Sequence, residues 1–168
     1  TQAFASLYME YGDEIVNKVI EHHKNNGGMS RFEKFCIYHE SFLNQEINQN
    51  VETLWNSKTI PKLWVYNLHY FDDLNAINAD QRINWHSNLI DRWIYENPPG
   101  QGNGWEAYPS SLRIINWIKW SLIGNSFKQV WLDSLAIQVR YLSSNLETHL
   151  LGNHLFANAK ALIFAGLF

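Results

Sequence analysis

From residue 80 to the end of the chain, apolar side chains recur every three or four positions, in segments separated by short polar loops. This spacing predicts α-helices, because residues three and four apart lie on one face of a helix. Helices joined by short loops pack as antiparallel hairpins. The chain is therefore predicted to be all-α, with helices at about Asp80–Glu96, Tyr108–Gly124, Lys128–His149 and from Asn153 onward.

The individual segments carry further expectations. Trp85, Leu89 and Trp93 should lie on one face of their helix, and the last helix, which is apolar almost all round, should be an inner, buried one. The loop 97–105 is glycine-rich but follows a predicted helix and lacks the spacing of a nucleotide-binding loop, so no nucleotide site is expected.

The first part of the chain has weaker signals. Residues 1–25 show helical spacing and end at Asn25-Asn-Gly-Gly28, which stops a helix. Residues 30–60 favour no clear element, and the aromatic segment 63–74 is expected to start extended and to become helical near Tyr70. We therefore expect a helical lead-in over residues 1–60 and a helical domain over residues 61–168.

Composition excludes several classes of partner. The net charge of −3 argues against a nucleic-acid surface, which needs a basic face, and a single cysteine excludes an intrachain disulfide. No apolar run reaches the length of a membrane span. We expect no metal and no cofactor. The chain starts at Thr1 without a signal peptide and ends in the apolar run 163–168, so we expect it to be a piece of a larger protein whose remainder packs against it.

Asn153 and His154 stand at the predicted start of the last helix, directly after Gly152. An amide donor beside an imidazole can handle a carboxylate and a proton together. In β-elimination of a uronic-acid polymer, an amide stabilises the charge that develops on the substrate carboxylate, while a histidine accepts or donates the proton. The alternatives are that Asn153 only caps the helix and that His154 is a satisfied core histidine.

A second candidate surface is aromatic. The chain has eight Trp, eight Tyr and nine Phe, which suit a packed core but also suit sugar binding, where rings stack on pyranose faces. Arg113, Asn116, Trp117 and Trp120 share one stripe of their predicted helix. They could form the floor for an anionic sugar. Alternatively, Arg113 forms a salt bridge with a neighbouring helix and the tryptophans fill the core.

Three motifs resemble the N-terminal helical region of the heparinase II/III-like proteins, which are bacterial polysaccharide lyases and their relatives. The motifs lie at residues 64–74, 104–119 and 146–162, in the family's order. The resemblance implies part of an incomplete α/α toroid, followed in the full-length protein by a β-sandwich that this chain lacks. It also implies the bacterial periplasm or cell surface as the location.

The resemblance implies roles for named residues. Asn153 matches the carboxylate-neutralising asparagine, and His154 matches the adjacent histidine, a base or substrate-orienting group. The family's catalytic tyrosine follows this motif, whereas the last tyrosine here is Tyr141, so we expect this piece alone to have no lyase activity. The expected substrate-binding residues, from the motifs and the helix stripe, are Tyr66, Asn67, His69, Trp105, Tyr108, Arg113, Asn116 and Trp117.

The leading interpretation is therefore the N-terminal part of a lyase that cleaves an acidic polysaccharide. Few basic residues lie near the motifs, which weighs against a heavily sulfated polymer. The alternative is a non-catalytic glycan-binding or assembly module in surface-polysaccharide metabolism. A third possibility is a toroid glycoside hydrolase that uses paired carboxylates such as Glu106 and Glu147.

Overall fold

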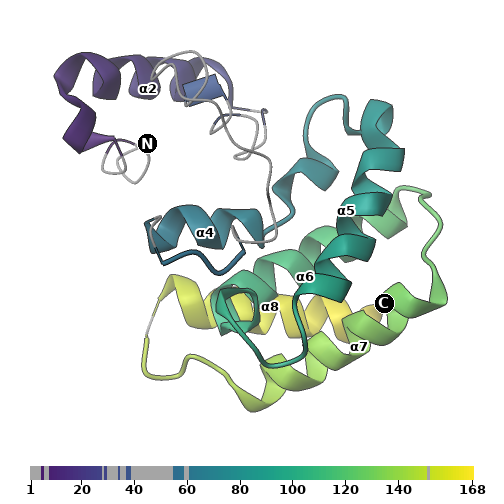
Figure 1. The fold of residues 1–168 in the computed structure, drawn as a ribbon. Coiled ribbons are helices and arrows are strands. Elements are labelled where there is room, and N and C mark those ends of the chain that lie inside the picture. Colours follow the sequence, from purple (N-terminus) through teal and green to yellow (C-terminus); the bar gives the residue numbers. More distant parts are fainter. Residues whose placement is uncertain are drawn as a thin grey trace.

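In the computed structural model the chain is all-α (Figure 1). The structure describes residues 8–27, 55–58, 61–150 and 152–168, and five further positions: Ala5, Met29, Lys34, Ile37 and Tyr38. No β-strand occurs in these residues. The α-helices are α2 (Asp13–Asn25), α4 (Lys62–Leu68), α5 (Ile83–Glu96), α6 (Ala107–Leu122), α7 (Gln129–Ser144) and α8 (Asn153–Leu167). Single 3-10 turns lie at η1 (Met9–Tyr11), η4 (Asp72–Asn75), η5 (Ala79–Arg82) and η6 (Asn103–Trp105).

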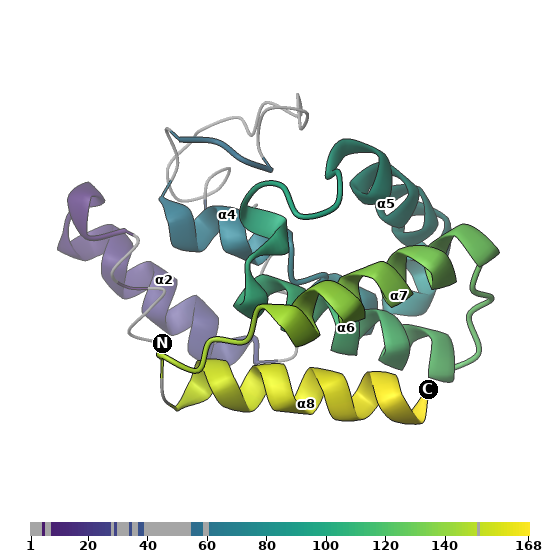
Figure 2. The same ribbon diagram turned by 90° about the horizontal axis from the view of Figure 1, so that it is seen from below.

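Helices α6, α7 and α8 form the predicted hairpins. Each runs opposite to the one before it, so that α6 and α8 lie parallel and side by side (Figures 1 and 2). The contact between α6 and α8 is the most extensive one between any two elements. Antiparallel hairpins are the repeating unit of a toroid, but closure into a toroid stays a prediction for this chain.

Helix α6 is buried on both of its apolar stripes. Ile115 and Ile118 are buried on one side, while Trp117 and Trp120 are buried on the other. Phe71 and Trp93 meet the ring of Trp117 edge to face, with centroids 5.5 and 5.8 Å apart. Edge-to-face contacts of this kind are the favoured geometry of aromatic pairs. The tryptophan stripe of α6 therefore fills the core, as the second interpretation of that stripe predicts.

The prediction that residues 63–74 start extended is wrong. Pro61 begins a helix instead, because its carbonyl oxygen accepts the N–H groups of Trp64 and Val65 at 2.9 and 3.2 Å. Helix α4 ends at Leu68, and Phe71 then takes a left-handed conformation with φ of 58°. Apolar or aromatic side chains stand at residues 63–66 and again at residue 68, which hides the helical period, so the pattern alone misled the prediction.

Two helix ends also differ from their predicted positions. The first helix begins at Asp13 because Gly12 takes φ of +87°, a conformation that ends the preceding 3-10 turn. Helix α7 ends at Ser144, before His149, because the side-chain amide of Asn145 donates to the carbonyl of Tyr141 at 2.8 Å. Predicted structure between residues 30 and 54 lies outside the described residues, except at isolated positions.

The predicted face of α5 is shifted at its start. Trp93 is fully buried, but Trp85 is 42% exposed and His86 takes the inner position. His86 turns inward because its Nε2 lies 2.7 Å from a carboxylate oxygen of Asp73, which Arg82 also binds through two nitrogens. Paired polar groups of this kind can be buried without an unsatisfied charge.

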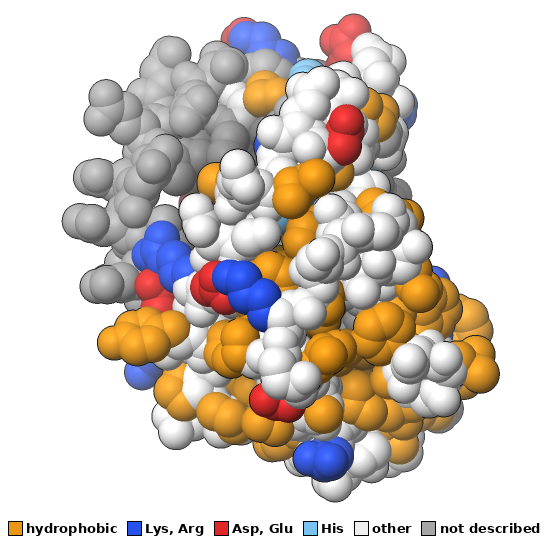
Figure 3. Space-filling view, turned by 90° about the vertical axis from the view of Figure 1, so that its right-hand side faces the viewer, with side chains coloured by type: hydrophobic (Ala, Val, Ile, Leu, Met, Phe, Trp, Pro, Cys, Tyr) orange, Lys and Arg blue, Asp and Glu red, His pale blue; other side chains and the backbone are white. Residues whose placement is uncertain are grey.

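Helix α8 is not the fully buried inner helix that its composition predicts. Ala157, Asn158 and Ala161 face α6, whereas Phe156, Ile163 and Leu167 are 72%, 61% and 86% exposed. Figure 3 shows hydrophobic side chains gathered over the lower part of the end of the molecule where α7 begins and α8 ends. None of the described helices has the length and apolar character needed to cross a bilayer.

Candidate functional site

The polar residues of the motifs meet at one end of the molecule. Helix α4, the start of α6 and the start of α8 lie together there, at the left of Figures 1 and 2. Two linked clusters occupy this end, one around His154 and one around Glu106. Tyr108 connects them, because it stacks on His154 and follows Glu106 by two residues in the first turn of α6.

His154 is held by contacts on two sides. Its Nδ1 lies 3.1 Å from Oε2 of Glu147, and the ring of Tyr108 stacks on the imidazole with centroids 4.4 Å apart. The His154 side chain is 37% exposed, so it is not a core histidine. Within the described part of the chain, its Nε2 makes no hydrogen bond. The ring is therefore oriented and open to solvent on one side.

Asn153 does not cap α8. The N-cap residue is Gly152, with φ of 88°, and no side chain accepts a hydrogen bond from the first turn. Asn153 is the first helical residue, is exposed, and its amide bonds to none of the described residues. An amide in this state can donate to an approaching oxygen without first breaking another bond.

Tyr66, Glu106 and Lys62 form the second cluster. The hydroxyl of Tyr66 donates to the Glu106 carboxylate, and Lys62 lies 3.0 Å from the same carboxylate. Burial, assisted by the hydrogen bond to Glu106, raises the pKa of Tyr66 to about 12. The hydrogen bonds to Tyr66 and Glu106 raise the pKa of Lys62. Tyr66 therefore stays a neutral hydroxyl donor over the whole physiological range.

Four of the predicted substrate-binding residues lie inside the core: His69, Trp105, Arg113 and Trp117, each 0–3% exposed. Both ring nitrogens of His69 are used within the fold, by the carbonyl of Trp55 at 2.8 Å and by Nε1 of Trp93 at 3.0 Å. Burial, and the charge of Arg113, lower the pKa of His69 to about 3. These side chains are enclosed by the core and have no surface on which a ligand could rest.

Arg113 has no carboxylate partner among the described residues, so the alternative in which it forms a salt bridge with a neighbouring helix is wrong. Its Nε donates to Oε1 of Gln138 at 2.8 Å and its Nη1 donates to the carbonyl of Gly104 at 2.8 Å. Its guanidinium also lies over the ring of Trp93 at 3.8 Å. Arg113 joins α6, α7 and the loop before α6.

The two predicted asparagines are also mainly structural. The Asn67 amide donates to the carbonyl of Leu63 at 2.6 Å. The Asn116 amide donates to the carbonyl of Tyr70 at 2.8 Å and to Asp72 at 2.9 Å. Both side chains are about 9% exposed and hold backbone in the segments beside α4. Of the ten predicted site residues, the structure therefore brings Tyr66, Tyr108, Asn153 and His154 to the accessible surface of one end.

Four residues of this end were missed by the sequence-based site prediction: Lys62, Glu106, Glu147 and Asn158. Only Lys62 could have been found from the sequence. It stands four positions before Tyr66, and residues four apart are neighbours on the surface of a helix. Glu106 and Glu147 were considered only as a hydrolase pair, and Asn158 was not considered. The loop between α7 and α8 turns back on itself, which no sequence spacing shows. This turn brings the Glu147 side chain to His154. It also lets the backbone N–H of Glu147 donate to Oδ1 of Asn158 at 2.9 Å.

Other possible binding features lie elsewhere. A hollow of about 270 Å³ between α7 and α8 is lined by apolar side chains and Arg140, and it includes Phe168. At 1.5 Å per residue, that end of α8 lies roughly 20 Å from His154. No group of three or more potential metal ligands occurs among the described residues.

No family model, curated protein or solved structure matches this chain. The similarity of residues 64–74, 104–119 and 146–162 to the heparinase II/III-like proteins therefore stays a prediction from the sequence.

Proposed function

We propose that this chain supplies the amide and the imidazole of a polysaccharide lyase, which cleaves an acidic, uronate-containing glycan by β-elimination. The observation that carries the proposal is the state of two consecutive side chains at the start of α8. The Asn153 amide is exposed and bonds to none of the described residues, and the His154 ring beside it is oriented by Glu147 and Tyr108. The three family-like motifs support the same assignment.

The chemistry assigns a role to each side chain. The Asn153 amide donates to the substrate carboxylate, where negative charge develops as the C5–H bond breaks. The His154 imidazole accepts that proton. The electron pair forms the C4–C5 double bond while the C4–O glycosidic bond breaks, and the leaving oxygen takes a proton from an acid. In the family that acid is a tyrosine after the Asn-His motif, which we expect outside this chain.

The surroundings of the pair indicate the class of polymer. Tyr108 and Tyr66 offer a ring and a neutral hydroxyl to a sugar. The two clusters contain two carboxylates, Glu106 and Glu147, and one lysine, Lys62, which Glu106 already binds. A heavily sulfated chain would meet too few cations here, so a uronate polymer with little or no sulfate is proposed.

The alternative is a glycan-binding or assembly module without chemistry. The observation in its favour is that Tyr66, Tyr108 and Asn153 offer sugar-binding groups at one surface, whereas the other six predicted substrate-binding residues are buried. Such a module would lie at the bacterial cell surface or in the periplasm, as the resemblance implies.

The test incubates the intact protein with a panel of uronate polymers. A lyase releases products with an unsaturated sugar that absorbs in the ultraviolet. A hydrolase that uses Glu106 and Glu147 gives reducing ends without that absorbance, and a binding module gives neither. We expect ultraviolet-absorbing products, with turnover reduced about 100-fold or more in Asn153→Ala and in His154→Ala.

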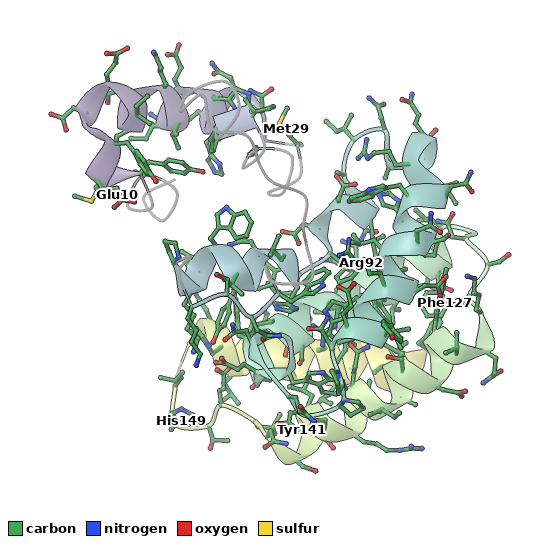
Figure 4. All side chains as sticks on the ribbon, in the orientation of Figure 1. Glu10, Met29, Arg92, Phe127, Tyr141 and His149 are labelled. Atoms are coloured by element: carbon green, nitrogen blue, oxygen red, sulfur yellow. The ribbon has the colours of Figure 1, made fainter. Side chains whose placement is uncertain are left out.

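Two matched variants serve as controls. Asn84→Ala changes an exposed asparagine in the first turn of α5, and His149→Ala changes an exposed histidine in the loop before α8 (Figure 4). Both should keep wild-type turnover. Wild-type turnover in Asn153→Ala and His154→Ala as well would remove the pair from the mechanism.

A further inference from the structure

Glu147 and His154 form an ion pair or hydrogen bond whose chemistry fixes which imidazole nitrogen carries a hydrogen. Oε2 of Glu147 lies 3.1 Å from Nδ1 of His154. A carboxylate only accepts hydrogen bonds, so Nδ1 must be the donor. In the neutral ring the hydrogen then resides on Nδ1, and Nε2 keeps its lone pair.

The plane of the ring is fixed independently by Tyr108. The two rings stack with centroids 4.4 Å apart and an angle of 31° between their planes. Tyr108 is itself held by Tyr70, whose ring meets it edge to face at 5.9 Å. The Tyr108 ring therefore covers one face of the imidazole, and the Glu147 carboxylate lies at Nδ1. Nε2 points away from both Tyr108 and Glu147.

Glu147 is held through its backbone, so its side chain is available to orient His154. The Glu147 N–H donates to Oδ1 of Asn158 at 2.9 Å, and the Asn158 amide donates to the Ser111 hydroxyl at 3.0 Å. Asn158 is fully buried between α8 and α6. The loop that carries Glu147 is thus anchored to both helices by groups other than its carboxylate.

We infer that Glu147 is a positioning residue, which holds His154 in the Nδ1–H tautomer and leaves Nε2 as the proton acceptor of the site. When Nε2 takes a proton, both ring nitrogens carry hydrogen, and the Glu147 carboxylate faces the cation that forms. The same division of roles between a carboxylate and a histidine recurs in hydrolytic triads. The catalytic use of Nε2 rests on the proposed lyase function, whereas the tautomer does not.

The test observes the tautomer directly in the intact protein. Histidine labelled with nitrogen-15 in the ring reports by NMR which nitrogen carries hydrogen, and the His154 signals are assigned by their loss in His154→Gln. We expect the Nδ1–H form in the wild-type protein at a pH where the ring is neutral. Glu147→Gln and Glu147→Met, both of similar length, remove the group that can only accept a hydrogen bond, so both should shift His154 toward the Nε2–H form.

Turnover gives the second readout. Glu147→Met and Glu147→Gln should each lower kcat about 10- to 100-fold or more with little change in KM. Both variants keep the backbone bond to Asn158, and circular dichroism checks that they fold. Unfolding of Glu147→Met leaves the wild-type and Glu147→Gln tautomers as the deciding measurement.

The outcomes separate this inference from the lyase proposal. An Nε2–H ring in the wild-type protein, or an unchanged Nδ1–H ring in folded Glu147→Met, would overturn the positioning role even if polymers are cleaved. The expected tautomers without any cleavage would support the positioning role and would reject the lyase.

Discussion

Gly104 faces the imidazole of His69 so closely that a Cβ atom at position 104 would lie 2.5 Å from Nδ1 and 2.7 Å from Cε1. The ring cannot retreat, because Trp55 and Trp93 hydrogen-bond its two nitrogens. The carbonyl of Gly104 also accepts a hydrogen bond from Arg113. The glycine of this motif is thus required by close packing against a buried histidine.

The variant Gly104→Ala should destabilise the protein. The added methyl group overlaps a fixed ring, so we expect a loss of about 1–3 kcal/mol in the free energy of unfolding, measured by urea titration. Gly166→Ala is the control, because a Cβ at this helical position meets nothing within 4 Å. It should stabilise α8 by up to about 1 kcal/mol. Equal stability of the two variants would contradict the packing argument.

The burial of His69 predicts a loss of stability in mild acid. Its pKa is lowered from 6.5 to about 3 in the folded chain, mainly by burial and also by Arg113. Below pH 6.5 the unfolded chain therefore binds a proton that the folded chain excludes. The free energy of unfolding should fall by about 1.4 kcal/mol per pH unit from this group, between about pH 6 and pH 4.

Urea titrations at several pH values measure that slope, and His69→Gln isolates the contribution of the one ring. The variant will be less stable at pH 7. Its free energy of unfolding should vary less steeply with pH, because unfolding of the variant takes up about one proton fewer. Parallel slopes for the wild-type protein and the variant would show that His69 is already protonated in the fold.

Replacing Arg113 with lysine should be costly although the charge is kept. One ammonium cannot reach Gln138, Gly104 and the face of Trp93 together, as the planar guanidinium does. We expect a loss of about 2–4 kcal/mol in the free energy of unfolding, because buried acceptors are left without donors. Arg140→Lys, at an exposed position of α7, should change stability by less than about 0.5 kcal/mol. A similarly small effect of Arg113→Lys would exclude the guanidinium as the link between α6 and α7.

Asn158→Ala should loosen the loop that carries Glu147. The change removes the acceptor of the Glu147 N–H and the donor to Ser111, so we expect about 1–2 kcal/mol of destabilisation. Hydrogen exchange of the Glu147 amide should accelerate more than exchange in the middle of α6. Lys160→Ala, at an exposed site on the same helix, should leave that amide protected. Unchanged protection in Asn158→Ala would mean that other contacts hold the loop.

The Tyr66 hydroxyl should respond to Glu106. Burial is the main cause of its raised pKa of about 12, and the carboxylate adds to it. In Glu106→Gln the pKa of Tyr66 should fall but remain above its ordinary value of 10.0. Ultraviolet titration, with Tyr66→Phe subtracted to isolate the one phenol, measures it. Glu14→Gln on the remote helix α2 should leave the titration unchanged, and a Glu106→Gln curve equal to wild type would remove the carboxylate as a cause.

The helices at the C-terminal end could be predicted because their signal is local. Apolar spacing placed α6 within one residue at its start and α8 at Asn153. The same method failed at α4, where nearly every position is apolar or aromatic and no period stands out. It also misjudged α8, because composition shows that a helix is apolar but does not show which side its neighbours cover.

The adjacency of Asn153 and His154 is a property of the sequence alone, and so is the chemistry that an amide and an imidazole can perform. Only the tertiary structure decided what surrounds them. Tyr108 and Glu147 reach His154 from a different helix and from a loop that turns back, and these contacts depend on how α6 and α8 pack. Arg113 and Trp117 likewise lie in the core because neighbouring elements cover both sides of α6. The sequence of α6 alone does not show that both of its sides are covered.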